Sequence, residues 1–152
     1  MRELESWYRA GEIAREVIRD AQKKVRPGLK IIELCEYIEE KIRSMGAKPA
    51  FPANISINNI AAHYTSPPDD RMIIPKRCIV KVDIGVVLWD GAIADTAITV
   101  GVNAAKKEDM LIKATRETLE EAIQHIKAGA VSYTHLRAHE TEADLVCRLL
   151  LE

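Results

Sequence analysis

Two aspartates interrupt an apolar, strand-like stretch in the middle of the chain. Asp83 and Asp95 lie within residues 82–100, which otherwise consist mainly of Val, Ile and Ala around a Trp-Asp-Gly segment. A buried carboxylate without a partner is costly, so such residues need hydrogen-bond donors, a cation or a metal ion. Two carboxylates on one face of a sheet would suit divalent cations, which take oxygen ligands and can activate water for hydrolysis. The alternative is a pair of turn or edge aspartates bonded to backbone amides.

The turn between the two strands decides whether the carboxylates share a face, because side chains alternate along a strand. A two-residue Asp-Gly loop would place Asp95 opposite Val86, on the face away from Asp83. A three-residue Trp-Asp-Gly loop with Gly91 left-handed would place Asp95 opposite Gly85 instead. Gly85 shares its face with Asp83, so the carboxylates would be diagonal neighbours with Cβ atoms about 7 Å apart. The metal hypothesis therefore requires the three-residue loop.

A third candidate group, His63, stands where an apolar segment meets the polar residues 65–70 (TSPPDD). Loops that follow ordered segments often carry groups that touch a substrate. A lone histidine is more often a surface residue or a satisfied interior one, so His63 does not define a site by itself.

The composition is that of one globular domain with a hydrophobic core. The chain has 152 residues, of which 47% are hydrophobic and 30% charged, and its formal net charge is −1. This balance argues against nucleic acid or an anionic membrane as the main partner. The charged N-terminus lacks the apolar run of a signal peptide or membrane span, which predicts a cytoplasmic protein. Cys35 and Cys78 stand in apolar contexts, and we expect both to be core residues.

Hydrophobic periodicity predicts an α+β fold. Apolar residues at three- and four-residue steps indicate three helices, over residues 4–25, 30–45 and 104–127. Segments rich in β-branched residues indicate strands within residues 50–62, 78–88 and 92–100. Asn103 is the expected N-cap of the third helix.

Two helices carry apolar stripes that we expect to be buried. The stripe of the second helix comprises Ile31, Leu34, Cys35, Ile38 and Ile42. The stripe of the third comprises Ile112, Thr115, Leu119, Ala122, Ile123 and Ile126. The first and third helices end in similar segments, VRPG at 25–28 and IKAG at 126–129, which suggests an α+β unit used twice.

The motifs resemble those of one peptidase family. Residues 51–65 (FPANISINNIAAHYT) are followed by DIG at 83–85 and DGAIADTA at 90–97, and this series resembles type 2 methionine aminopeptidases in their archaeal form. The resemblance covers about residues 1–130 and implies a pita-bread fold built from two related halves. It also implies metal-dependent removal of the initiator methionine from nascent proteins.

The resemblance assigns roles to four residues. Asp83 and Asp95 would be two of five residues holding two divalent metal ions (Co, Fe, Mn or Zn), with Asp95 bridging both. His63 would be the catalytic residue that hydrogen-bonds to the bound substrate near the scissile peptide. Phe51 would line the pocket for the methionine side chain, although a core role for Phe51 is equally open. The implied partners are N-terminal methionyl peptides, with the ribosome as a further candidate and neither a membrane nor a specific nucleic acid.

Two features depart from the family's pattern. The two aspartates are 95 − 83 = 12 positions apart where the family usually has 11, and the three-residue turn would absorb the extra residue. Residues 131–152 contain none of the motifs that carry the family's remaining ligands, and they resemble translated adapter sequence. The His135 and His139 pair with Glu140 lies in this segment and is set aside. We therefore expect residues 1–130 to be the N-terminal half of the catalytic domain, residues 131–152 to be a non-native tail, and the chain alone to be inactive.

Two other functions stay open. The first is a non-catalytic pita-bread protein that binds the ribosome or RNA, and the retained carboxylates and the lack of basic excess argue against it. The second is a proline-dipeptidase-like hydrolase of the same fold, and the motif at residues 51–64 favours the methionine enzyme over it.

Overall fold

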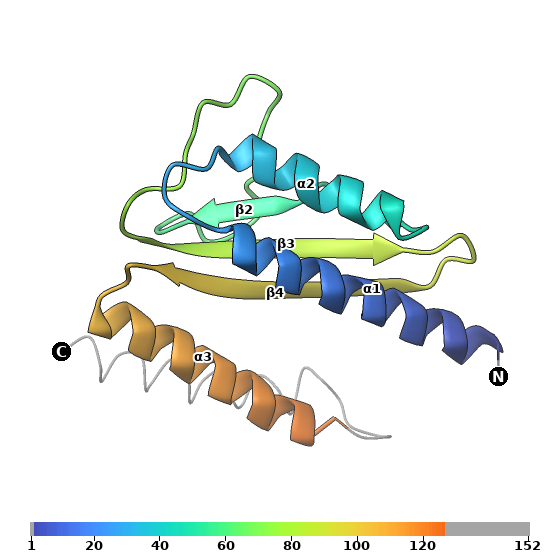
Figure 1. Ribbon diagram of the computed structural model, residues 1–152. Helices are drawn as coiled ribbons and strands as arrows, with labels where there is room; N and C mark the ends of the chain where they lie inside the picture. The colour runs from blue at the N-terminus through green and yellow to red at the C-terminus, as the bar shows by residue number, and fades with distance from the viewer. Residues whose placement is uncertain (1, 127–152) are drawn as a thin grey trace. The chain divides into compact units, whose positions relative to one another are not determined.

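The computed structural model describes residues 2–126 of the chain (Figure 1). Its elements are α1 (Arg2–Lys24), α2 (Ile31–Ser44), β1 (Lys48–Pro49), β2 (Asn54–Ile57), β3 (Cys78–Val87), β4 (Ile93–Val102) and α3 (Lys106–Gln124). The chain divides into two compact units, residues 1–104 and residues 105–152, so every element except α3 belongs to the first unit. The predicted non-native tail, with its two histidines, lies outside the described residues.

The first unit contains one antiparallel sheet with β3 at its centre. One edge of β3 pairs with β4 along the whole strand, from Cys78 opposite Val102 to Val87 opposite Ile93. The other edge pairs first with β2 and then with β1. The chain leaves this edge between β1 and β2, at residues 50–53. The predicted α+β class is confirmed, and the predicted strand within residues 50–62 is β2.

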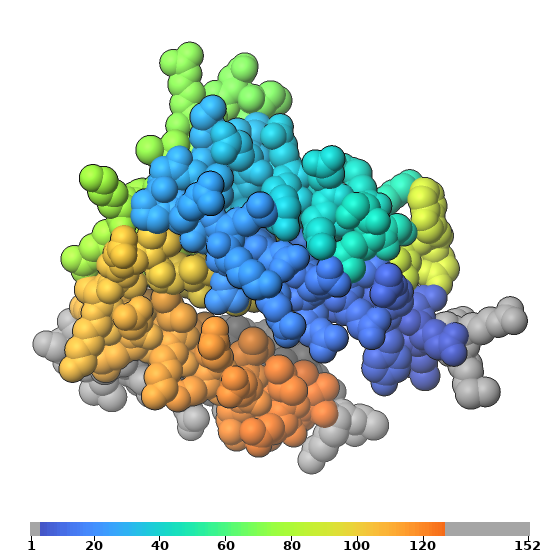
Figure 2. Space-filling model, in the orientation of Figure 1, coloured from blue at the N-terminus to red at the C-terminus, as the bar shows by residue number. Residues whose placement is uncertain are grey.

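Helices α1 and α2 cover one face of the sheet. α1 contacts β3 and β4, α2 contacts β1 and β2, and the two helices contact each other. Figure 2 shows their side chains packed next to one another over this face. The core beneath them contains the even-numbered residues of β3 and the inner stripes of both helices, including Ile13, Val17, Leu34, Ile38, Val80, Val82, Ile84 and Val86. All five predicted stripe residues of α2 are buried, Cys35 among them, and Cys78 of β3 is buried as well.

The odd-numbered residues of β3 and β4 form the other face of the sheet, which we call the carboxylate face. Side chains alternate along a strand, so the odd-numbered residues within 79–87 of β3 and 93–101 of β4 point away from the two-helix layer. Asp83 is half-buried on this face and Asp95 is exposed. The two-helix layer therefore supports the strands from behind and leaves the carboxylate groups on the opposite side.

Two predictions about α3 are wrong. The helix begins at Lys106 with Ala105 as N-cap, and the backbone N–H of Ala105 donates to the Glu108 carboxylate. Asn103 instead adopts a left-handed conformation with φ +45° and donates through Nδ2 to the Lys76 carbonyl at 2.7 Å. Asn103 therefore lies two residues before the N-cap position, with a left-handed backbone in place of the extended one that an N-cap adopts.

The apolar stripe of α3 is not buried. Leu119 and Ile123 are 57% and 56% exposed, and no residue of this helix is buried in the part of the chain that the structure describes. Periodicity locates a stripe but does not say which surface covers it. Among α1, α2 and α3, none has the length and apolar composition needed to cross a bilayer.

Candidate functional site

The turn between β3 and β4 is the three-residue loop Trp89-Asp90-Gly91. The Leu88 N–H donates to the Ala92 carbonyl at 2.9 Å, and the Gly91 N–H donates back to the Leu88 carbonyl at 3.0 Å. Gly91 has φ +89°, a conformation that glycine adopts without the steric cost of a Cβ. The Asp90 carboxylate accepts from the Ala92 N–H at 3.3 Å, so Asp90 stabilises the turn. The predicted loop length is confirmed.

This loop fixes the register that brings the two other carboxylates onto one face. Gly85 lies opposite Asp95, and Asp83 lies opposite Ala97. Asp83 and Asp95 are therefore diagonal cross-strand neighbours, whose Cβ atoms lie about 7 Å apart in such a pair. The shared face that the metal hypothesis requires is present.

Gly85 is a place where two segments come close together. A Cβ atom built on Gly85 would lie 2.4 Å from Cε1 of Phe51 and 2.9 Å from Cβ of Ala50. The Phe51 ring thus occupies the space that the missing side chain leaves, beside the strand position opposite Asp95. The sequence indicated that Gly85 leaves room, but it contained no signal for which side chain would fill the space.

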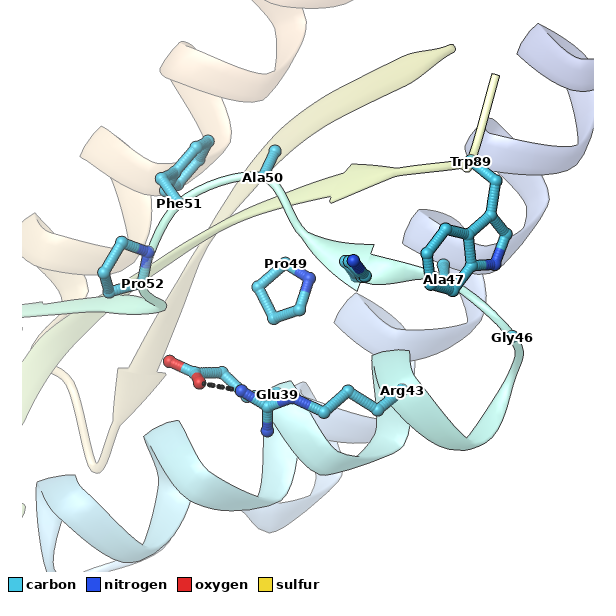
Figure 3. A pocket seen from close by; sticks show the side chains of 10 residues that line it. Glu39, Arg43, Gly46, Ala47, Pro49, Ala50, Phe51, Pro52 and Trp89 are labelled. Atoms are coloured by element: carbon cyan, nitrogen blue, oxygen red, sulfur yellow. Dashed lines mark hydrogen bonds and ion pairs between the residues drawn. The ribbon is translucent and has the colours of Figure 1, made fainter. Parts of the chain in front are cut away.

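A pocket of about 600 Å³ is lined by residues 46–52 together with Glu39, Arg43 and Trp89 (Figure 3). Figure 3 shows Phe51 pointing away from the Glu39–Arg43 pair that lines this pocket. Arg43 donates to Glu39 at 2.8 Å, and the Lys48 ammonium lies 4.1 Å from the centroid of a Trp89 ring. Phe51 is among the residues that line this pocket, but neither Asp83 nor Asp95 is.

His63 lies in the loop between β2 and β3, where it is exposed and has φ +62°. The loop runs along β2, because the Ile55 N–H donates to the Tyr64 carbonyl at 2.8 Å and Thr65 forms a bridge with Asn54. This pairing places Thr65 beside Asn54, the β2 residue opposite Asp83. His63 lies two residues before Thr65. Within residues 2–126, His63 makes no hydrogen bond or ion pair with either aspartate of the carboxylate face.

Lys81 also lies on the carboxylate face, but its charge is directed into this loop. Its ammonium group donates to the carbonyl of Asn58 at 2.9 Å and to the carbonyl of Ile60. Partial burial lowers the pKa of Lys81. The ammonium therefore anchors the start of the His63 loop.

Asp70 holds the end of the same loop. Its carboxylate accepts hydrogen bonds from the Ser66 hydroxyl at 2.6 Å, the Tyr64 hydroxyl at 3.0 Å and the Met72 N–H at 2.8 Å. These donors, with Ser66 first, hold the pKa of Asp70 below its ordinary value of 3.8. Asp, Ser and Pro in TSPPDD indicated a turn, but no pattern in the sequence marked Asp70 as its centre.

We expect the His63 loop to loosen in acid. A lowered carboxyl pKa stabilises the fold above the unfolded-state pKa, and this stability is lost as the pH falls through the folded-state pKa of Asp70. The Met72 amide signal should therefore shift in NMR spectra as the pH falls below the ordinary value of 3.8, and Asp70→Asn should produce a similar shift at neutral pH. Asp69→Asn, next to it in the chain, is the control. A Met72 signal that stays constant in acid would contradict this role of Asp70.

Asp83 and Asp95 are suitable in kind as ligands for a divalent ion. Carboxylate oxygens suit hard and borderline divalent cations. In the described range, however, no group of three or more His, Cys, Asp or Glu side chains is placed to hold a metal ion. Within residues 2–126, Cys35 and Cys78 are free and buried, and burial raises the pKa of Cys35 to about 11, so this thiol is not a ready ligand. The two aspartates therefore fit as part of a metal centre whose other ligands lie elsewhere.

Comparison with known sequences identifies the family. The profile of metallopeptidase family M24 matches residues 5–141. A methionine aminopeptidase of Methanothermobacter thermautotrophicus is 48% identical over 127 residues, which cover 83% of this chain and 42% of the relative. A methionine aminopeptidase of Methanothermus fervidus is 47% identical over 139 residues, which cover 83% of this chain and 72% of the relative. The chain thus spans less than half the length of the first of these relatives.

Solved structures agree with this assignment. A methionine aminopeptidase of Thermotoga maritima superposes with a TM-score of 0.76 at 27% identity, over 83% of this chain and 53% of that one. The prolidase of Pyrococcus furiosus gives a TM-score of 0.80 at 21% identity, over 94% and 44%, which shows a shared fold only. The predicted pita-bread fold is confirmed, with this chain covering part of it. The chain belongs to metallopeptidase family M24 and, within that family, to the archaeal methionine aminopeptidases.

Proposed function

We propose that this chain is the N-terminal part of a cytoplasmic, metal-dependent aminopeptidase that removes the initiator methionine from nascent proteins. The observation that carries the proposal is the β3–β4 register, which puts Asp83 and Asp95 on one face of the sheet. This arrangement occurs in a chain that is 48% identical to a methionine aminopeptidase. A ribosome contact has no supporting feature on the described surface and is left out of the proposal.

Asp83 and Asp95 would supply carboxylate ligands to the divalent ions that membership of the metallopeptidase family implies. Two ions, drawn from Co, Fe, Mn and Zn, are the proposed occupants. When bound, such ions provide a Lewis acid and an activated water for peptide hydrolysis. Asp83 and Asp95 cannot complete the coordination of two ions, so residues outside the described range must contribute the other ligands.

His63 and Phe51 would bind the substrate near these carboxylates. The exposed His63 imidazole, on a loop pinned beside Asn54, would donate a hydrogen bond to the peptide near the bond that is cleaved. The Phe51 ring, which lies over Gly85, would contact the methionine side chain. Contacts between a thioether and an aromatic ring are favourable, so this wall suits methionine.

The carboxylate role can be tested by ion binding to the chain itself. Mn²⁺ binding followed by electron paramagnetic resonance should weaken by about tenfold or more in Asp83→Asn and in Asp95→Asn, because each variant removes a charged oxygen ligand. Asp109→Asn, an exposed carboxylate on α3, should leave the affinity unchanged. Equal affinity in all four proteins would show that the carboxylate face is not the ion site.

The activity can be tested by completing the chain. Residues 1–126 can be joined to the part of the Methanothermobacter relative that follows its matched segment. We expect this fusion, but not the 152-residue chain alone, to release methionine from a methionyl peptide when a divalent ion is added. Asp83→Asn in the fusion should abolish the release. Faster cleavage of Xaa-Pro dipeptides than of methionyl peptides would instead favour the proline-dipeptidase alternative.

A further inference from the structure

A polar chain of three side chains connects the carboxylate face to the His63 loop. Asn54 lies directly opposite Asp83 in the β2–β3 register, and its amide Nδ2 donates to Oδ2 of Asp83 at 3.4 Å. The Thr65 hydroxyl donates to Oδ1 of the same Asn54 amide at 2.7 Å. Thr65 lies two residues after His63 on a loop that is bridged to β2.

The chemistry of the three groups fixes which group donates and which accepts in each of the two hydrogen bonds. An ionised carboxylate can only accept hydrogen bonds, so the Asn54 NH₂ group must face Asp83. The Asn54 carbonyl oxygen then faces Thr65, whose hydroxyl has to donate. The Thr65 hydroxyl therefore determines which way the Asn54 amide is oriented, and the amide in turn holds one oxygen of Asp83. No described residue donates a hydrogen bond to the other oxygen of Asp83, Oδ1, which leaves it available to a ligand.

Asn54 is unusual for its position, since asparagine is depleted in strands and this side chain is only 9% exposed. Asn54 lies on the carboxylate face because it pairs with Asp83, whereas the β2 residues that face the core, Ile55 and Ile57, are the aliphatic residues that a strand favours. A buried amide is tolerated when its donors and acceptors are satisfied, as they are here. A residue that breaks the local preference of its element often serves a site.

We propose that Asn54 is a positioning residue that orients the Asp83 carboxylate toward a bound metal ion, and that Thr65 sets the direction of the Asn54 amide. The same two residues tie the carboxylate to the loop that carries His63. Residues that hydrogen-bond to a metal ligand fix its orientation, and their replacement typically weakens metal binding by about 10–100-fold. This inference rests on the proposed role of Asp83 as a ligand.

The test uses the 152-residue chain and the affinity for Mn²⁺ as its readout. Thr65→Val keeps the side-chain shape but removes the hydroxyl, whereas Thr65→Ser keeps the hydroxyl. Asn54→Leu removes the amide that faces Asp83. Ser56→Ala is the matched control, because Ser56 lies on the same strand and accepts from the N–H of Tyr64 in the same loop, but it does not contact Asp83.

We expect Thr65→Val and Asn54→Leu to weaken Mn²⁺ binding by about tenfold, and Thr65→Ser and Ser56→Ala to stay within about twofold of the wild type. In the metal-free chain, Thr65→Val should also shift the side-chain NH₂ signals of Asn54 in NMR spectra, and Thr65→Ser should restore them. If Asn54→Leu fails to fold, the comparison of Thr65→Val with Thr65→Ser, at an exposed position, still tests the inference.

Three results would overturn the inference. If Asp83→Asn weakens Mn²⁺ binding but Thr65→Val keeps the wild-type affinity, the positioning role is rejected and the proposed metal centre is left intact. An equal loss in Ser56→Ala and Thr65→Val would show that loop packing, not the Asn54 amide, controls the affinity. Unchanged affinity in Asp83→Asn would reject the metal centre and the positioning role together.

Discussion

A Gly85→Ala variant is expected to lose about 1–3 kcal/mol of its free energy of unfolding, as overpacked core substitutions typically do. The added methyl group would lie 2.4 Å from Cε1 of Phe51 and 2.9 Å from Cβ of Ala50, well inside van der Waals contact. The Phe51 ring can rotate away, but Ala50 is fixed by its backbone hydrogen bond to Gly85. Urea denaturation followed by circular dichroism measures the loss.

A double-mutant cycle separates the ring from the backbone at this point. In a Phe51→Ala background, Gly85→Ala should cost less than in the wild type, because the contact at 2.4 Å is gone and only the contact with Ala50 stays. The difference between the two costs measures the coupling between positions 51 and 85. Equal costs in both backgrounds would show that the Phe51 ring does not lie over Gly85.

The second large effect is expected in the two-helix layer. Ile38→Ala should lower the free energy of unfolding by about 2–5 kcal/mol, since a fully buried aliphatic side chain is replaced by a cavity. Leu119→Ala on α3 should change it by about 0.5 kcal/mol or less, because Leu119 is 57% exposed. Both residues lie on stripes with the same helical period, so the pair compares a covered stripe with an uncovered one.

Denaturant titration with tryptophan fluorescence and circular dichroism checks both values. Ile38→Val serves as a milder control, expected to cost about 0.5–1.5 kcal/mol because it removes a single methyl group. A Leu119→Ala loss as large as that of Ile38→Ala would mean that the α3 stripe is buried in solution.

The elements of the first unit could be predicted because each has a strong local signal. The apolar stripe of α2 repeats with helical period, and Gly46, whose φ of +82° suits a helix end, follows the helix. The β3–β4 register could also be predicted, because turn chemistry fixes loop length and loop length fixes pairing. The shared face of Asp83 and Asp95 followed from Gly91 and simple counting.

The rest of the site depends on contacts between segments far apart in the chain. Phe51 over Gly85 and Asn54 between Asp83 and Thr65 leave no periodic trace in the sequence. The Asn103 prediction failed for a related reason, since Asn103 bonds to the distant Lys76 carbonyl and the helix begins two residues later than its cap would require. The α3 stripe had the right period, but period alone does not identify the surface that covers a stripe.

The loop between β3 and β4 makes one end of the hairpin tolerant of length changes and its middle intolerant. The Leu88–Ala92 pair closes the loop, so a residue gained or lost between these two positions would keep Gly85 opposite the second aspartate provided that Leu88 and Ala92 still pair. A residue gained in β4 between Ala92 and Asp95 would instead turn Asp95 toward the two-helix layer. The spacing of 12 between the aspartates is therefore accommodated at the tip, where the three-residue loop keeps both carboxylates on one face.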